Sequence, residues 1–157
     1  MKEMRKLENF KRELEAFDKT IEWCQDTFKK AKQINLNKTS FTKKELEVVD
    51  LFLARFSRSV DMFINRVLRS LDVLELEDKN MKTTLDIIIG AEKRGIVEDY
   101  RLIVNLRDLR NKIAHEYIWE RNLELKETFK KAIEQMYVLL EISNNLKQYA
   151  ANKGYIK

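Results

Sequence analysis

The chain has 157 residues, of which 44% are hydrophobic and 36% charged, with three glycines and no proline. This length fits a single domain over residues 1–157 with a core of its own, and the scarcity of glycine and proline favours long helices over sheets and turns. The formal net charge of +5 suits a polyanionic partner such as RNA, but 31 basic and 26 acidic residues mixed along the chain equally suit solvated helix faces.

The lone cysteine, Cys24, excludes an intramolecular disulfide, and its place among apolar residues of helical spacing is typical of a core position. No stretch approaches the roughly 20 apolar residues of a membrane span, and the first residues lack the apolar segment of a signal peptide. We therefore expect a cytoplasmic protein with no membrane partner.

Apolar residues recur every three or four positions through the first thirty residues, which predicts a long amphipathic helix. They are Leu7, Phe10, Leu14, Phe17, Ile21, Cys24, Phe28 and Ala31. The stretch INLNKTS (34–40) breaks this pattern. A second long helix, antiparallel to the first, is predicted to begin near Lys43, because Thr42 and Glu45 have the spacing of a capping box. LELEDKN (74–80) ends it.

Three further helices are predicted. A short one covers TLDIIIGAEKR (84–94), with Thr83 and Asp86 as its cap pair and Gly95 in the left-handed position after its end. The fourth runs from about Glu98, and its buried side is predicted to carry Leu102, Leu106, Leu109 and Ile113. The fifth is marked by Leu125, Phe129, Ala132, Met136, Leu139 and Leu146, and it fades into AANKGYIK (150–157), which we expect to be frayed. Together these stripes predict an all-α antiparallel up-and-down bundle of about five helices.

The octapeptide RNKIAHEY (110–117) contains the only histidine, His115. An isolated histidine in a helical bundle is most often an ordinary surface or core residue. Here, however, fixed positive charge and hydrogen-bond donors precede the one side chain that titrates near neutrality. These neighbours are Arg107, Arg110, Asn111 and Lys112.

Helix geometry restricts how these side chains can meet. On an unbroken helix Arg110 and Tyr117 differ by about 20° around the axis, whereas Arg110 and His115 differ by about 140°. Arg110 and His115 would converge only if the helix ended before His115, or if a second copy of the chain completed the site across a two-fold interface.

RNKIAHEY resembles the RX4HXY signature of the HEPN superfamily, in particular the HepT-like ribonuclease toxins that are paired with a minimal nucleotidyltransferase (MNT) antitoxin. DIIIGAEKRGIVEDYRLIVNLRDLRNKIAHEY (86–117) is similar to the region leading into that signature, and the five-helix layout is similar over nearly the whole chain. The resemblance implies a HEPN-like two-fold homodimer, the toxin of a toxin-antitoxin system, that cleaves cellular RNA in a cleft between the two motif copies without a metal or other cofactor.

Carried onto this sequence, the resemblance makes Arg110 and His115 the catalytic pair and Asn111 their polar neighbour. Tyr117 would receive AMP from the partner nucleotidyltransferase, which silences the toxin; the alternative is a buried tyrosine at the end of the bundle. RNA carries its own nucleophile, the 2′-hydroxyl, so cleavage needs a proton carrier, which His115 suits, and a cation on the phosphate, which Arg110 suits. No cluster of carboxylates or Cys/His pairs offers a metal site, in agreement with a metal-independent reaction.

Further polar residues of the second helix lie away from its apolar seam: Arg55, Arg58, Asp61, Asn65 and Arg69. They are either solvated or part of a dimer interface, or Arg58 and Asp61 line the cleft and orient Arg110 or contact the RNA backbone.

Lys93, Arg94 and Arg107 would extend a phosphate track, with Lys112 and Asn111 as further RNA contacts. Tyr100 and Trp119 would stack a base, or pack as ordinary aromatics. Two rival interpretations remain: a non-catalytic helical protein that binds a nucleotidyltransferase as its substrate or substrate-binding subunit, and a dimeric scaffold without a ligand.

Overall fold

The computed structural model describes residues 2–76, 82–115 and 122–157, and within these ranges all regular structure is helical. The helices are α1 (Lys2–Ala31), α2 (Lys43–Met62), α3 (Arg69–Glu75), α4 (Thr84–Lys93), α5 (Arg101–His115) and α6 (Asn122–Asn152), with a π-helical segment, η1 (Phe63–Leu68), between α2 and α3. Because α2, η1 and α3 follow one another without a break, the described residues form five helical rods. The prediction of an all-α helical bundle is confirmed.

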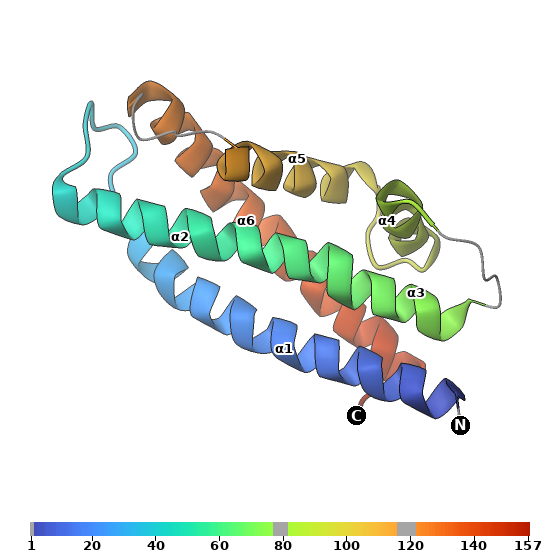
Figure 1. Ribbon diagram of the computed structural model, residues 1–157. Coiled ribbons are helices and arrows are strands. Elements are labelled where there is room, and N and C mark those ends of the chain that lie inside the picture. The colour runs from blue at the N-terminus through green and yellow to red at the C-terminus, as the bar shows by residue number, and fades with distance from the viewer. Residues whose placement is uncertain (1, 77–81, 116–121) are drawn as a thin grey trace.

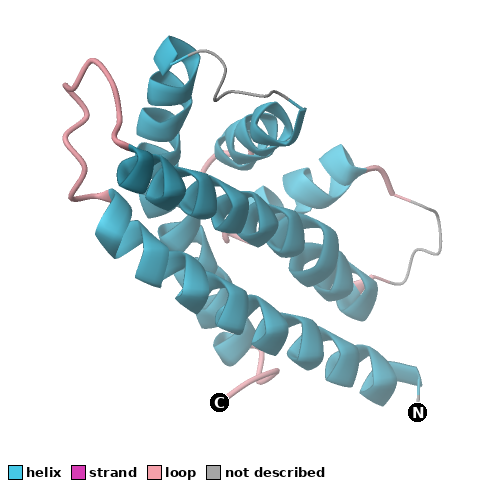
Figure 2. Ribbon diagram, turned by 60° about the vertical axis from the view of Figure 1, so that its left-hand side comes forward, coloured by secondary structure: helices cyan, strands magenta, loops and turns pink. Residues whose placement is uncertain are grey.

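The four long rods alternate in direction, as Figure 1 shows. The rod of α2, η1 and α3 packs against α1 along its length and runs the opposite way, and α5 and α6 cover its other side. The short α4 contacts η1, α3 and α5, so that it fills the end of the bundle beside α5 (Figure 2). No helix of the described residues is long and apolar enough to cross a membrane.

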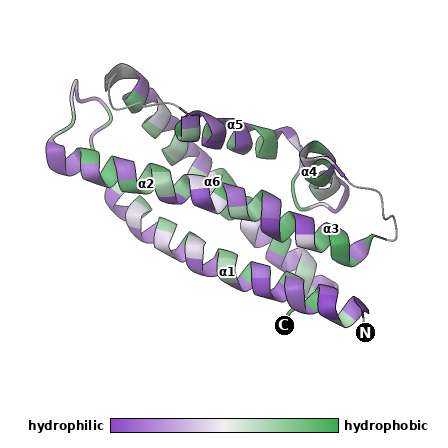
Figure 3. Ribbon diagram, viewed as in Figure 1, coloured by the Kyte–Doolittle hydropathy of each residue, from purple (hydrophilic) through white to green (hydrophobic). Residues whose placement is uncertain are grey.

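The apolar stripes of the helices meet in one buried cluster, and hydrophilic and hydrophobic positions alternate around the helices in Figure 3. Cys24 is fully buried in this cluster, as predicted, with its Sγ 3.7 Å from the Sδ of Met136 on α6. Burial raises the pKa of the Cys24 thiol to about 11, against the lowering effects of the Ser59 hydrogen bond and the Arg55 charge.

Both predicted capping boxes are present. The Thr42 side chain accepts a hydrogen bond from the backbone of Glu45, and the Thr83 side chain accepts one from Asp86, while each acidic side chain accepts one from the threonine backbone in return. Gly95 has φ +75°, which confirms its left-handed position after α4. The boundaries of α2 and α4 are therefore encoded locally.

Two predictions about helix ends are wrong, one for the start of α5 and one for the segment after α6. Leu102 was expected on the buried side of the fourth helix, but 38% of it is exposed, and Ile103 is buried instead. Leu102 lies within about 20° of the buried Leu109 around the axis of α5. However, Leu102 is the second residue of α5, and α6 diverges from α5 toward this N-terminal end (Figure 1).

The C-terminal segment, which we expected to be frayed, is docked. Ala150 is fully buried, and the left-handed Gly154, with φ +78°, turns the chain after α6. The Tyr155 hydroxyl donates a 2.8 Å hydrogen bond to Glu75 Oε2, and its ring meets that of Phe10 edge to face at 6.1 Å. A tertiary hydrogen bond and a ring contact thus order a segment whose composition alone suggests fraying.

Candidate functional site

A hollow of about 190 Å³ lies between α2, η1, the first residue of α4 and α5. We call it the arginine hollow, and its described lining comprises Val60, Asp61, Ile64, Asn65, Thr84, Arg107, Arg110 and Asn111. Four of the residues predicted for the site therefore come together here: Asp61, Arg107, Arg110 and Asn111. They lie on two helices that pack against each other.

Arg110 is held from two sides. Its Nη2 lies 3.2 Å from Asp61 Oδ1, and its Nη1 donates a 2.9 Å hydrogen bond to Asn111 Oδ1. The same Asp61 oxygen accepts a 2.9 Å hydrogen bond from Asn65 Nδ2. The Arg110 and Asp61 side chains are 33% and 40% exposed, so the pair adds only about 0–1 kcal/mol to stability. Its main effect is to fix the direction of the guanidinium.

Arg107 is one helical turn before Arg110 and lines the same hollow. Its Nε is buried and donates a hydrogen bond to none of the described residues. The described lining thus carries two guanidinium groups against one carboxylate, a balance that favours an anion.

His115 is the last residue of α5 and is exposed. Because α5 is unbroken from Arg101 to His115, the helix does not end before the histidine, and Arg110 and His115 stay about 140° apart around the axis. His115 is not among the described residues of the arginine hollow. Within one chain, therefore, the structure does not bring the predicted catalytic pair together.

Two predicted supporting residues lie elsewhere. Lys112 lines a second hollow of about 380 Å³ between α5 and α6, together with residues that include Asp108, Lys131 and Gln135. Arg58 is exposed and forms no hydrogen bond or ion pair with the described residues. Tyr117 and Trp119 lie outside the described residues, and Tyr100 is half-buried and packs against the core.

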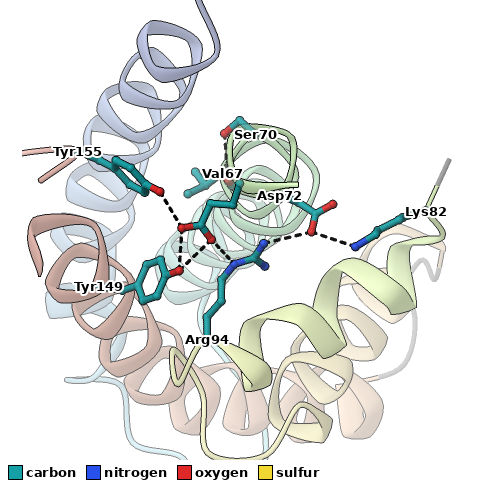
Figure 4. A network of polar contacts seen from close by, with 8 residues as sticks. Val67, Ser70, Asp72, Lys82, Arg94, Tyr149 and Tyr155 are labelled. Carbon is teal, nitrogen blue, oxygen red and sulfur yellow. Dashed lines mark hydrogen bonds and ion pairs between the residues drawn. The ribbon is translucent and has the colours of Figure 1, made fainter. Parts of the chain in front are cut away.

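Arg94, expected on a phosphate track, is instead part of a polar network between α3, α4 and the end of α6 (Figure 4). Its Nε lies 2.6 Å from Glu75 Oε1 and its Nη2 3.3 Å from Asp72 Oδ1. The Tyr149 and Tyr155 hydroxyls donate to Glu75 as well. With 12% of its side chain exposed and its charge neutralised, Arg94 is not available to RNA, so that prediction is wrong.

These contacts shift the pKa values of the network. Burial alone would raise the pKa of Glu75, but hydrogen bonds from Tyr149, Arg94 and Tyr155 outweigh burial and lower it. Burial and the Glu75 hydrogen bond raise the pKa of Tyr149 to about 12, and the same causes raise the pKa of Tyr155 to about 12. The network therefore stabilises an ionised Glu75 beside two neutral tyrosines.

Sequence reasoning named Asn65 without its contact to Asp61, and it missed Thr84 and the π-helix beside the arginine hollow. Asn65 follows Asp61 by four positions, a spacing that places the two side chains on one helix face, so this contact was accessible from the sequence. Thr84 carried no such signal, because only the packing of α4 on η1 brings it to the hollow. π-Helical turns occur frequently at functional sites, and η1 supplies Ile64 and Asn65 to this one.

The described residues contain no group of three or more His, Cys, Asp or Glu side chains placed to hold a metal ion. A scan against protein-family models, a search of the curated proteins and a search of the solved structures each return no match for this chain.

Proposed function

We propose that this chain is a metal-independent endoribonuclease, the HEPN-like toxin of a toxin-antitoxin pair, which acts on cellular RNA in the cytoplasm as a homodimer. The observation that carries the proposal is Arg110 itself. Asp61 and Asn111 orient its guanidinium in a hollow with a second arginine, through one contact each of Nη2 and Nη1, and a guanidinium has further N–H donors beyond these two. An oriented guanidinium with free donors is suited to bidentate contact with phosphate oxygens.

The chemistry requires one proton carrier and one cation. His115 takes the proton of the ribose 2′-hydroxyl, and the 2′-oxygen attacks the adjacent phosphorus. The bond from phosphorus to the 5′-oxygen breaks as that oxygen takes a proton from a water molecule, which the protonated His115 reprotonates, and the products are a 2′,3′-cyclic phosphate and a 5′-hydroxyl. Arg110 stabilises the negative charge that develops on the phosphate oxygens in the transition state.

The helix geometry supports a site shared by two copies of the chain. Arg110 lies in the arginine hollow, whereas His115 is exposed on another side of the same unbroken helix. In a two-fold dimer, His115 of one protomer would face Arg110 of its partner, and symmetry would create two such sites.

Mixing two inactive variants tests both the activity and the composite site. Arg110→Ala and His115→Ala homodimers should each lose RNA cleavage, by on the order of 10²- to 10⁴-fold for the histidine. A coexpressed mixture should recover about a quarter of the wild-type activity, because half of the dimers are mixed and each of these regains one of two sites. No recovery would exclude the composite site, and full activity of the His115→Ala homodimer would exclude the mechanism. A chelator should leave the wild-type rate unchanged.

The proposal includes the antitoxin. A partner nucleotidyltransferase would add AMP to Tyr117, two residues beyond His115 and, on a continued helix, within about 20° of Arg110. The added phosphate would bind the Arg110 guanidinium, and the nucleoside would block the access of RNA to it.

A second candidate is a non-catalytic protein that binds the nucleotidyltransferase as its substrate-binding partner. The Asp61–Arg110 ion pair favours it, because a carboxylate already neutralises the arginine in the free chain. This candidate predicts tight association with the nucleotidyltransferase, and no RNA cleavage by the purified wild-type chain.

A further inference from the structure

Arg107 is the cation of the arginine hollow that has no described counterion. Asp61 is engaged by Arg110 and by the Asn65 amide, whereas the Arg107 Nε–H is buried without an acceptor among the described residues. A buried donor left unpaired is unfavourable, so a ligand that supplies acceptors here is favoured.

We propose that the arginine hollow binds the phosphate next to the scissile one, with Arg107 as its principal ligand. The proposal rests on the proposed function, because it assumes that Arg110 holds the scissile phosphate. It commits the enzyme to a substrate with at least two consecutive charged phosphodiester linkages.

The donors of the hollow match a phosphodiester, whose two non-bridging oxygens only accept hydrogen bonds. Besides Arg107, the lining offers the hydroxyl of Thr84 and the amide NH₂ of Asn111, whose Oδ1 already accepts from Arg110. None of the described lining residues is aromatic, so the hollow lacks the platform on which a base would stack.

Size and spacing agree with this assignment. About 190 Å³ corresponds to roughly six water molecules at ~30 Å³ each, enough room for the five heavy atoms of a phosphate group. Arg107 and Arg110 are three positions apart on α5, which separates their Cβ atoms by roughly 5–6 Å. A separation of this order matches one nucleotide step along a strand.

Binding of inorganic phosphate tests the site without RNA. In nitrogen-15 NMR spectra of the full chain, titration with phosphate should shift the Arg107 Nε–H and the Thr84 amide. The Thr84 shift should vanish in Arg107→Gln, and both shifts should persist in Arg101→Gln, a matched control that removes one charge from the exposed start of the same helix. Arg107→Lys, which keeps the charge, guards against a folding defect and should retain weakened binding. Unmoved resonances, or equal shifts in Arg107→Gln, would overturn the site.

Neutral linkages test the place of the site along RNA. At a linkage that the wild-type protein cuts, replacing one neighbouring phosphodiester by an uncharged methylphosphonate should lower kcat/KM by on the order of ten- to a hundredfold. Arg107→Gln should be insensitive to the same replacement, and Arg101→Gln should respond like the wild type.

The possible failures of the two hypotheses differ. If the wild type cuts RNA and ignores both neutral neighbours, the subsite is wrong and the ribonuclease stands. If phosphate binds through Arg107 and no RNA is cut, the ribonuclease is wrong, and with it the position next to a scissile linkage.

Discussion

The Asp61 carboxylate lies 3.2 Å from the guanidinium of Arg110, across the interface between α2 and α5. Since this contact places a negative charge where a phosphate would otherwise be attracted, Asp61 has two opposing effects on a ribonuclease. It aligns Arg110, and it weakens the attraction of the arginine hollow for RNA.

Asp61→Asn separates these effects. The amide has the shape of the carboxylate but not its charge, so RNA should bind more tightly and KM should fall. The less firmly oriented Arg110 should lower kcat, on the order of tenfold. Steady-state kinetics on one RNA would measure both constants. Asp18→Asn, which breaks a comparably exposed ion pair with Lys147, serves as the control and should change neither. A simple loss of binding would contradict a positioning role.

Arg110→Lys should be nearly as damaging as loss of the side chain. Lysine keeps the positive charge but has no planar fork for two parallel hydrogen bonds to a phosphate. Circular dichroism should show an unchanged helical content, because the native ion pair is partly exposed and contributes little stability. Single-turnover cleavage measures the effect, and a rate near that of the wild type would mean that charge alone suffices.

Gly90→Ala should destabilise the protein although it lies inside α4. Helix propensity alone favours alanine over glycine by about 1 kcal/mol. The added Cβ, however, would lie 2.9 Å from Arg94 Nη1, and the ion pairs with Asp72 and Glu75 hold that group in place.

The presence of Arg94 decides whether helix propensity or the steric contact has the larger effect. Once Arg94→Ala has removed the obstacle, Gly90→Ala should become stabilising by about 1 kcal/mol. Urea denaturation of the four proteins in this cycle measures both signs. Stabilisation by Gly90→Ala in the wild-type protein would show that the Arg94 side chain moves away from the new Cβ without a loss of stability.

The tyrosines of the network predict a loss of stability at alkaline pH. The pKa values of Tyr149 and Tyr155 rise from 10.0 to about 12 on folding, so between these pH values the unfolded chain ionises first. The free energy of unfolding should therefore be unaffected by these groups below pH 10 and fall toward pH 12. Urea denaturation of the double variant Tyr149→Phe/Tyr155→Phe should show a shallower decline of the free energy of unfolding over this pH range than the wild type shows. An equally steep decline would exclude the two tyrosines as its cause.

Glu75 acts at the opposite end of the pH scale. Its pKa is lowered on folding, so its contribution is complete above the unfolded value of about 4.3 and is lost as the pH falls through the folded value. Glu75→Gln should cost about 3 kcal/mol at neutral pH, the low end for a largely buried pair that loses one partner. The difference from the wild type should shrink in acid, and a difference that does not vary with pH would point to packing instead.

Tyr117→Phe tests the proposed control by AMP transfer. Incubation of the wild type with the partner nucleotidyltransferase, ATP and magnesium should add one or more AMP units to the peptide containing Tyr117 and abolish cleavage. The phenylalanine variant should cleave RNA and escape inactivation, because it lacks the accepting hydroxyl. Mass spectrometry locates the modification, and an inactivated variant or a different modified residue would refute the assignment.

Local sequence signals were sufficient to predict where several helices of this fold begin or end. The capping boxes at Thr42 and Thr83 and the left-handed Gly95 fix helix ends through contacts a few residues apart, and these predictions are confirmed. Leu102 and the C-terminal segment were misjudged because their burial depends on the path of another helix and on Glu75, 80 positions before Tyr155.

In the candidate site, too, the contacts between different helices could not be predicted from the sequence. The pairing of Asp61 with Arg110 was one of several roles considered for Asp61, and helix spacing alone could not choose among them. The neutralisation of Arg94 was not foreseen, since its partners Asp72 and Glu75 lie on another helix and nothing in the stretch around Arg94 identifies them. Whether a charged side chain faces solvent or an ion pair is thus settled by the packing of helices.

The π-helical segment η1 joins two regions of polar chemistry on one continuous rod. Asp61, which contacts Arg110, precedes it, and Asp72 and Glu75, which contact Arg94, follow it. Because a π-helical turn (i→i+5) holds one residue more than an α-helical turn (i→i+4), removing one residue within η1 would let an α-helical turn replace it with little rotation of the residues after it relative to those before it. The wider turn therefore accommodates one extra residue between the arginine hollow and the buried network, and a single-residue deletion should be tolerated better in η1 than in the α-helical parts of the same rod, where it would rotate one of them by about 100° relative to the other.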